Sequence, residues 1–249
     1  FPVLGKKKLS EIKKADVLEV LRPIWSSKTE TASRVRGRLE NIFSYAVTDG
    51  LMEFNPAIWR GNLDRDLPPP SKIQIVEHHE AMPLEVLQEK ISCFYPADTR
   101  TRQVILFTIL TASRVGESVP ARWDEIDWEN RIWSVPPERR KDQKPYPHRV
   151  PLSDQAIELL KSIEKKSEYI FGVSEKSLGS RYSLTPLLKK MTGTTATMHG
   201  FRSTFRDWAA ENGVPDIVAE KCLMHTTGNA VVQAYQRSDL LEQRREVMQ

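Results

Sequence analysis

The feature that most constrains the fold of this chain is a run of three prolines, Pro68–Pro70. Proline has a fixed φ and no backbone N–H, so three in succession favour an extended, semi-stiff connector over a helix or a strand. The 249 residues are enough for one large domain or two small ones. We therefore predict a domain at residues 1–66, a linker at 67–80 and a second domain at 81–249.

Before the prolines, the sequence predicts a small helical unit. A first helix is expected over about 15–21, ending near Pro23. Ser27 and Glu30 have the spacing of a capping box and predict the start of a second helix, which Asp49-Gly50 ends. Apolar residues recur in it at helical spacing, at Val35, Leu39, Ile42, Phe43 and Ala46.

After the linker, helices are predicted near 84–94 and 102–111, with a short one from Gly116. The pattern then becomes aromatic and β-branched, which predicts strands that include Trp123, Ile126, Trp128, Ile132, Trp133 and Val135, and a further strand at 146–152. Ser153 can cap a helix that runs to about residue 165. Further helices are expected at about 185–191, 200–212, 215–223 and 229–236. The predicted fold class is mainly α with a small antiparallel β-sheet (α+β).

The composition excludes several classes of protein. The longest apolar run, Val104–Leu110, is far too short to span a membrane, and the first residues do not resemble a secretory signal. Two cysteines, Cys93 and Cys222, are too few for a disulfide framework or a four-thiolate zinc site. His78 and His79 are adjacent and lack a third ligand at useful spacing. We expect a cytoplasmic protein with no cofactor, no metal and no membrane contact.

The distribution of charge indicates a partner better than the net charge does. The net charge is only +4. Residues 176–206 contain lysines and arginines but no aspartate or glutamate, and residues 28–38 and 131–149 are also rich in basic side chains. Each segment alone is compatible with an ordinary solvated face. Together the three favour a polyanion as partner.

Three short segments hold candidate reactive groups. In His199-Gly200-Phe201-Arg202, a histidine and an arginine meet at a predicted helix N-terminus, which suits a phosphate, although a helix cap with a solvent-facing arginine is the common alternative. Arg114 lies at a break between two predicted helices, where Glu117 can hold its guanidinium, either for phosphate recognition or as a structural pair. His225 precedes Tyr235 by ten residues. A tyrosine can act as a covalent nucleophile when a base or cations assist it, but a lone tyrosine or histidine is more often structural.

The order of these segments resembles the tyrosine recombinases, specifically the prophage and genomic-island integrases. The similar segments are Thr111–Glu117, His148–Ser153, Met198–Trp208 (MHGFRSTFRDW) and Leu223–Arg237 (LMHTTGNAVVQAYQR), with Asn55-Pro56-Ala57 in the first part. The similarity extends over essentially the whole chain. Four boxes in the family order are far more specific than any one of them.

The resemblance implies site-specific DNA recombination without metal, through a covalent 3′-phosphotyrosine. Tyr235 would be the nucleophile, and Arg114 and Arg202 would bind the non-bridging phosphate oxygens. His199 would assist the tyrosine as a base, His225 would hydrogen-bond the phosphate, and Glu117 would orient Arg114. A lysine in a β-turn would protonate the leaving 5′-oxygen. Lys141 is the expected one and Lys144 is its rival, because the turn is about two residues longer than the family pattern.

The resemblance also implies partners and a domain organisation. Residues 1–66 resemble the helical core-binding domain, without its usual opening helices, so we expect a fragment of a longer protein. The expected partner is double-stranded DNA at attachment sites, bound by a homotetramer that is monomeric when free, with accessory DNA-bending factors. The expected DNA contacts are Arg34, Arg36, Arg38, Arg139, Arg140 and Lys144. The alternatives are a DNA-binding fragment or regulator without turnover, and a phosphotransferase that does not act on nucleic acid, for which the sequence lacks a Gly-rich phosphate loop.

Overall fold

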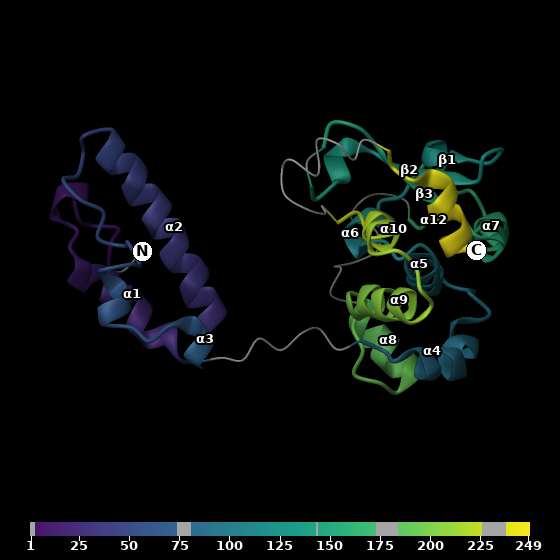
Figure 1. The fold of residues 1–249 in the computed structure, drawn as a ribbon, viewed down its shortest axis with the longest axis horizontal. Coiled ribbons are helices and arrows are strands. Elements are labelled where there is room, and N and C mark those ends of the chain that lie inside the picture. Colours follow the sequence, from purple (N-terminus) through teal and green to yellow (C-terminus); the bar gives the residue numbers. More distant parts are fainter. Residues whose placement is uncertain (1–2, 74–80, 143, 173–183, 226–237) are drawn as a thin grey trace. The chain divides into compact units, whose positions relative to one another are not determined.

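In the computed structural model, the chain divides into two units, Phe1–His78 and His79–Gln249 (Figure 1). The structure describes residues 3–73, 81–142, 144–172, 184–225 and 238–249. Each unit has its own hydrophobic core. No helix among these residues is long and apolar enough to cross a membrane.

The first unit is built on two packed helices, α1 (Lys14–Trp25) and α2 (Thr29–Thr48), followed by the short α3 (Pro70–Ile73). Its core includes Trp25, whose ring stacks on Trp59 with centroids 5.5 Å apart and whose Nε1 donates to the Pro68 carbonyl at 2.9 Å. This contact fastens the start of the proline run to α1.

Two predictions about these helices are wrong. Pro23 does not end α1 but lies within its last turn, and the helix continues to the buried Trp25. Ser27 and Glu30 form no capping box, because α2 begins at Thr29 with Lys28 as its N-cap residue. Glu30 instead pairs with Arg34 one turn later.

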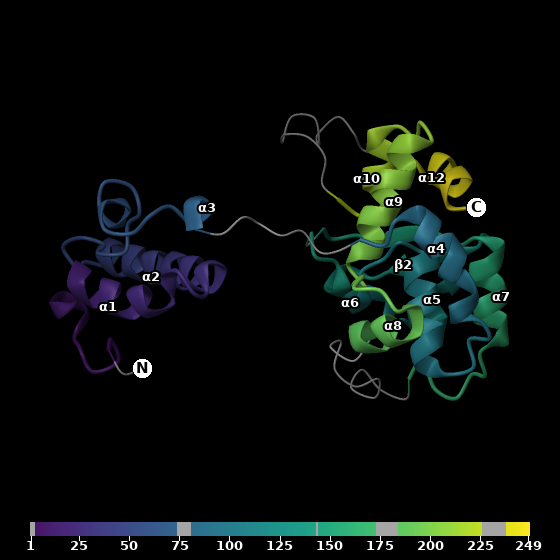
Figure 2. The ribbon, with the colours of Figure 1, turned by 90° about the horizontal axis from the view of Figure 1, so that it is seen from below.

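The second unit places helices around a central apolar helix, α5 (Arg100–Leu110), whose residues Val104–Phe107 are fully buried. Figures 1 and 2 show α5 among its neighbours, of which α7 and α8 pack directly on it. The other helices among the described residues of this unit are α4 (Leu84–Lys90), α6 (Val115–Ser118), α7 (Asp154–Ser162), α8 (Leu184–Thr192), α9 (Gly200–Glu211), α10 (Asp216–Cys222) and α12 (Leu241–Met248). Short 3-10 helices lie at Leu9–Glu11, Leu63–Arg65, Ile91–Phe94, Trp123–Glu125 and Pro137–Arg139.

A three-stranded antiparallel sheet completes this unit, in the order β1 (Ile126–Asp127), β2 (Ile132–Val135) and β3 (His148–Pro151). Trp133 on β2 lies opposite Val150 on β3, and its ring meets Phe107 of α5 at 5.0 Å between centroids. Helix α12 packs on β3 (Figure 1). The predicted fold class, mainly α with a small antiparallel sheet, is confirmed.

Local predictions in the second unit mostly agree with the structure. Ser153 caps α7, since its Oγ accepts from the Ala156 N–H at 3.3 Å, although the helix ends at Ser162. Trp123, predicted to lie in a strand, begins a 3-10 helix. The helix predicted at 229–236 lies outside the described residues.

Candidate active site

Arg114 is fixed by Glu117 through both its backbone and its side chain. Arg114 is the N-cap residue of α6, and Glu117 Oε2 accepts from its backbone N–H at 3.0 Å. The other oxygen, Oε1, accepts from Arg114 Nη1 at 3.0 Å. Glu117 is only 3% exposed, so this carboxylate has little freedom to move. The predicted Arg114–Glu117 contact is present in the structure.

Arg202 joins three segments that are distant in the sequence. It lies in the first turn of α9 and is only 4% exposed. Its Nη1 donates to the Ala112 carbonyl at 2.6 Å, and its Nη2 donates to the Leu223 carbonyl and lies 3.0 Å from His225 Nε2. Burial, with the nearby Arg114 charge, lowers the pKa of Arg202 to about 10, so the side chain remains a cation at neutral pH.

Two backbone carbonyls that hold these arginines belong to residues in the left-handed region. Ala112 has φ 47° and its carbonyl accepts from Arg202. Met224 has φ 51°, and its carbonyl accepts from Arg114 Nη2 at 3.5 Å while its Sδ lies 3.7 Å from Nη1. A non-glycine residue in this conformation is strained by roughly 1–2 kcal/mol. Neither residue was predicted to belong to the site, because neither alanine nor methionine indicates a left-handed turn.

His225 is held from both sides of its ring. Its Nδ1 lies 2.7 Å from Glu220 Oε2, while its Nε2 faces Arg202. Glu220 Oε1 accepts from Arg206 Nε at 3.1 Å. Burial and the Arg202 charge lower the pKa of His225, and Glu220 opposes them. Glu220 was not predicted to belong to the site, although its place on α10, one turn after Asp216, puts both acids on the helix face toward Arg206.

His199 and Tyr235 are two further residues predicted to be catalytic. His199 is exposed and directly precedes α9, so it lies at the positive end of that helix, three residues before Arg202. Tyr235 lies outside the described residues. The chain after it is tied to the same unit, since Lys221 Nζ donates to the Ser238 carbonyl and Arg149 Nη2 contacts Asp239 Oδ2 at 2.6 Å.

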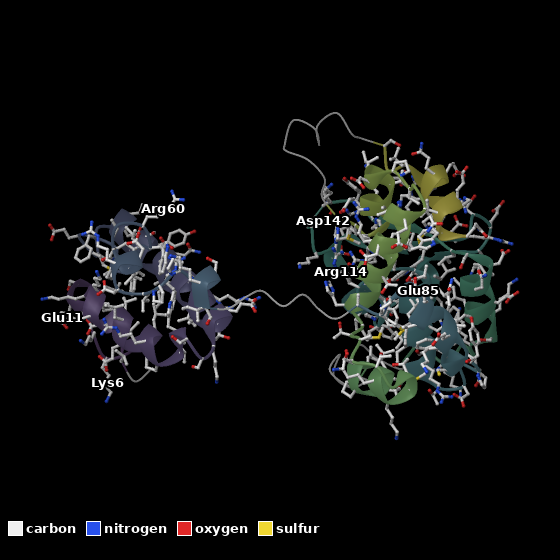
Figure 3. The ribbon with its side chains drawn as sticks, turned by 60° about the horizontal axis from the view of Figure 1, so that its bottom comes forward. Lys6, Glu11, Arg60, Glu85, Arg114 and Asp142 are labelled. Carbon is white, nitrogen blue, oxygen red and sulfur yellow. The ribbon has the colours of Figure 1, made fainter. Side chains whose placement is uncertain are left out.

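The turn between β2 and β3 holds the two candidate lysines. Lys141 is exposed and Lys144 is half-buried. Arg139 Nη1 donates to the Glu117 carbonyl at 3.3 Å, so the start of this turn is attached to α6. Figure 3 shows Arg114 and Asp142 on the same side of the unit. The turn that holds the two lysines therefore contacts α6, the helix that begins after Arg114.

Arg139 and Arg140 are engaged within the protein. Arg139 forms an ion pair with Glu125. Arg140 is only 7% exposed, contacts both oxygens of Asp142 at 2.7–2.8 Å and donates to the Tyr146 carbonyl at 2.8 Å. A DNA contact by either guanidinium would have to compete with these pairs. The DNA-binding role expected for both stays a prediction.

The arginines expected to bind DNA in the first unit lie on α2. Arg34 and Arg38 are exposed. Arg36 is less exposed, because it pairs with Glu40, donates to the Ala57 carbonyl at 3.4 Å and lies 5.7 Å from the centroid of the Trp59 ring. Arg36 is therefore partly committed to packing, unlike its two neighbours.

Among the described residues there is no group of three or more His, Cys, Asp or Glu side chains that could hold a metal ion. His78 and His79 lie outside those residues. Cys222 is buried and Cys93 is half-buried, and neither forms a disulfide.

Two family models match the chain, one in each unit. A model described as "Phage integrase central domain" matches residues 1–62, and one described as "Phage integrase family" matches residues 82–241. Among similar proteins, prophage integrase IntA of Escherichia coli (strain K12) is 30% identical over 256 residues, and prophage integrase IntZ of the same organism is 33% identical over 261 residues. Each match covers 100% of this chain. The chain spans about three fifths of the length of these relatives, 60% and 61%.

Solved structures share the fold at low sequence identity. A lambda integrase(75–356) dimer bound to a COC′ core site has a TM-score of 0.66 and 16% identity, covering 96% of this chain and 84% of that one. A lambda integrase tetramer bound to a Holliday junction has a TM-score of 0.65 and 15% identity, covering 96% and 68%. The Tn1549 transposon integrase in complex with circular intermediate DNA has a TM-score of 0.64 and 16% identity, covering 99% and 88%.

Proposed function

This chain belongs to the phage integrase family of tyrosine recombinases, and we propose that it carries out site-specific DNA recombination, integrating or excising a prophage or genomic island. The observation that carries the proposal is the cluster of Arg114, Arg202 and His225. Arg202 links the segment before Arg114 to His225, because its Nη1 donates to the Ala112 carbonyl at 2.6 Å and its Nη2 lies 3.0 Å from His225 Nε2. Two guanidiniums held this way suit the non-bridging oxygens of a phosphodiester.

In the proposed reaction, the phenolic oxygen of Tyr235 attacks the scissile phosphorus. The bond from phosphorus to the 5′-oxygen breaks, leaving a 3′-phosphotyrosine and a free 5′-hydroxyl. His199 takes the phenolic proton, and Lys141, with Lys144 as the rival, gives a proton to the leaving oxygen. A 5′-hydroxyl from a partner strand then reverses the step and releases the tyrosine.

The two arginines supply most of the electrostatic stabilisation in this scheme. Negative charge builds on the phosphoryl oxygens in the transition state, and donors already fixed in place stabilise it without reorganising. Glu117 fixes Arg114, while the carbonyls of Ala112 and Leu223 fix Arg202. His225 contributes a further hydrogen bond to the phosphate.

The proposed partner is double-stranded DNA at attachment sites. Lambda integrase, which shares the fold, is described as a dimer on a core site and as a tetramer on a Holliday junction. We propose that this protein likewise acts as a homotetramer on DNA and is monomeric when free, with accessory DNA-bending factors. The proposed location is the cytoplasm of the bacterial host, at the nucleoid.

A nicked suicide substrate tests the reaction. Cleavage next to the nick releases a short fragment, so the phosphotyrosine cannot be reversed and survives denaturing electrophoresis. We expect a covalent adduct with the wild-type chain and none with Tyr235→Phe. An adduct with Tyr235→Phe would contradict the nucleophile assignment. DNA binding by the wild-type chain without any adduct would favour the alternative, a DNA-binding fragment or regulator without turnover.

A further inference from the structure

Glu220 is a partly buried carboxylate that connects two basic side chains of the site. Its side chain is 23% exposed and lies on α10, five residues before His225. Oε1 accepts from Arg206 Nε at 3.1 Å, and Oε2 lies 2.7 Å from His225 Nδ1. Arg206 therefore fixes the orientation in which the second oxygen of Glu220 faces the imidazole.

The neighbours of His225 determine which ring nitrogen carries the proton. A guanidinium can only donate hydrogen bonds, so His225 Nε2, 3.0 Å from Arg202 Nη2, must be the acceptor. An ionised carboxylate can only accept, so Nδ1 carries the proton and donates it to Glu220. The free form of the site therefore holds a neutral His225 whose lone pair at Nε2 faces Arg202.

Charged groups from three segments surround this ring. Helix α9 contributes Arg202, the start of α6 contributes Arg114, and α10 contributes Glu220. Arg206 and Glu117 lie one contact further away, as partners of Glu220 and Arg114. Burial and Arg202 lower the pKa of His225, Arg114 lowers it further, and Glu220 is the group that raises it. Without Glu220 the ring would face an excess of positive charge.

We propose that Glu220 is a positioning residue, which aims His225 Nε2 at the phosphate site and supplies the countercharge that lets His225 bind DNA as a cation. The proposal rests on the proposed function. Because the Nδ1 proton is held by Glu220, Nε2 can donate to a phosphate oxygen only after the ring takes a second proton from solvent. A phosphate that engages Arg202 removes the donor from Nε2 and adds negative charge, and both changes favour that protonation.

The test compares Glu220→Gln with a matched control, Asp216→Asn. Both exchanges remove one negative charge from α10 and from the surroundings of Arg206, since Asp216 contacts Arg206 Nη2 at 2.8 Å. Of these two acids only Glu220 contacts His225, and the Asp216 side chain is 84% exposed. The first readout is the titration of His225 in the free protein, followed by NMR. The second is the pH dependence of adduct formation on a nicked substrate.

We expect the pKa of His225 in Glu220→Gln to fall by about one pH unit relative to wild type, and the Asp216→Asn value to stay at the wild-type value. The rate of adduct formation should fall as the pH rises, because only the protonated ring of His225 donates to the phosphate. In Glu220→Gln this fall should occur at a pH about one unit lower than in wild type. In the His225→Asn background, Glu220→Gln should change the adduct rate by less than about twofold, since the two residues act through one contact.

The outcomes separate this proposal from the proposed function. The positioning role is wrong if the pKa of His225 is the same in Glu220→Gln as in wild type. It is also wrong if Glu220→Gln slows adduct formation in the His225→Asn background as much as in the wild-type background. If the wild-type chain forms no adduct, the proposed function fails, while the NMR titration still tests the countercharge. Glu220→Asp, which keeps the charge but shortens the side chain, should give an intermediate pKa and replaces Glu220→Gln if that variant does not fold.

Discussion

Arginines are used in opposite ways in the two units of this protein. In the second unit, Arg202 and Arg140 are buried. Arg202 donates to two backbone carbonyls and contacts His225, and Arg140 donates to one carbonyl and to Asp142. On α2 of the first unit, Arg34 and its partner Glu30 are both 72% exposed, and Arg38 is exposed too. The two groups have the same chemistry but different environments.

The two groups of arginines differ in how firmly the guanidinium is held in place, and not in its charge. A guanidinium fixed by carbonyls is already oriented for a bidentate contact, whereas an exposed guanidinium adds positive charge without a fixed geometry. Changes in the buried group should therefore affect chemistry and folding strongly at single positions. Changes on α2 should have small effects, mostly through long-range charge.

Arg202→Lys should produce the largest effect, because it keeps the charge and removes the fork of donors. A lysine cannot reach the Ala112 and Leu223 carbonyls and a phosphate in the same geometry. We expect adduct formation on a nicked substrate to fall by about 1,000-fold, as when a fixed oxyanion donor is lost. The rate of adduct formation under single-turnover conditions measures the effect.

The matched control for Arg202→Lys is Arg34→Lys, the same exchange at an exposed site, which should leave the adduct rate within about twofold of wild type. Equal losses in the two variants would mean that the charge of Arg202 matters and its geometry does not. That result would remove the distinction between the two groups of arginines.

Arg140→Ala should have the next largest effect, and on folding. The exchange leaves Asp142 without its partner, and the Asp142 side chain is only 14% exposed. Breaking a buried pair in this way typically destabilises a protein by about 3 kcal/mol. Urea denaturation of the full chain measures the loss, and Arg34→Ala serves as the control. A stable Arg140→Ala variant with weakened DNA binding would instead identify Arg140 as a DNA contact.

The sequence predicted the elements better than the site, for physical reasons. Helices and strands follow from periodicity and caps, as Ser153 illustrates. Ala112 and Met224 adopt the left-handed conformation just after α5 and α10, but their carbonyls accept from arginines far away in the sequence, and no local pattern encodes those contacts. The burial of Arg140 likewise depends on how its turn folds back on Asp142 and Tyr146.

The burial of His148 beside two arginines should also make folding pH-dependent. This histidine is buried on β3, and burial, with the charges of Arg244 and Arg140, lowers its pKa well below the ordinary value. Below about pH 6.5 the unfolded chain therefore binds a proton that the folded chain does not. The free energy of unfolding should fall as the pH drops from 6.5 toward the lower folded value, by up to about 1.4 kcal/mol per pH unit.

Urea titrations at several pH values, with wild type and His148→Gln, measure this slope. The variant should lose less stability below pH 6.5, while the two curves run parallel above pH 7, where His148 is neutral in both states. Since His225 also has a lowered pKa, some slope should remain in the variant. Identical slopes in the two proteins would mean that His148 is not the group that titrates.

The smallest effects are expected for Arg34→Ala and Arg38→Ala on α2. Exposed ion pairs contribute about 0.5 kcal/mol or less, so the free energy of unfolding should barely change. If each side chain meets one phosphate, the slope of log affinity against log salt should become shallower by about 0.9 per exchange. Arg36→Ala sharpens the test, because Arg36 packs near Trp59 and pairs with Glu40. Arg36→Ala should therefore lower the free energy of unfolding more than Arg34→Ala or Arg38→Ala does. An unchanged salt slope in all three variants would mean that α2 lies away from the DNA backbone, and that its positive charge belongs to an ordinary solvated face.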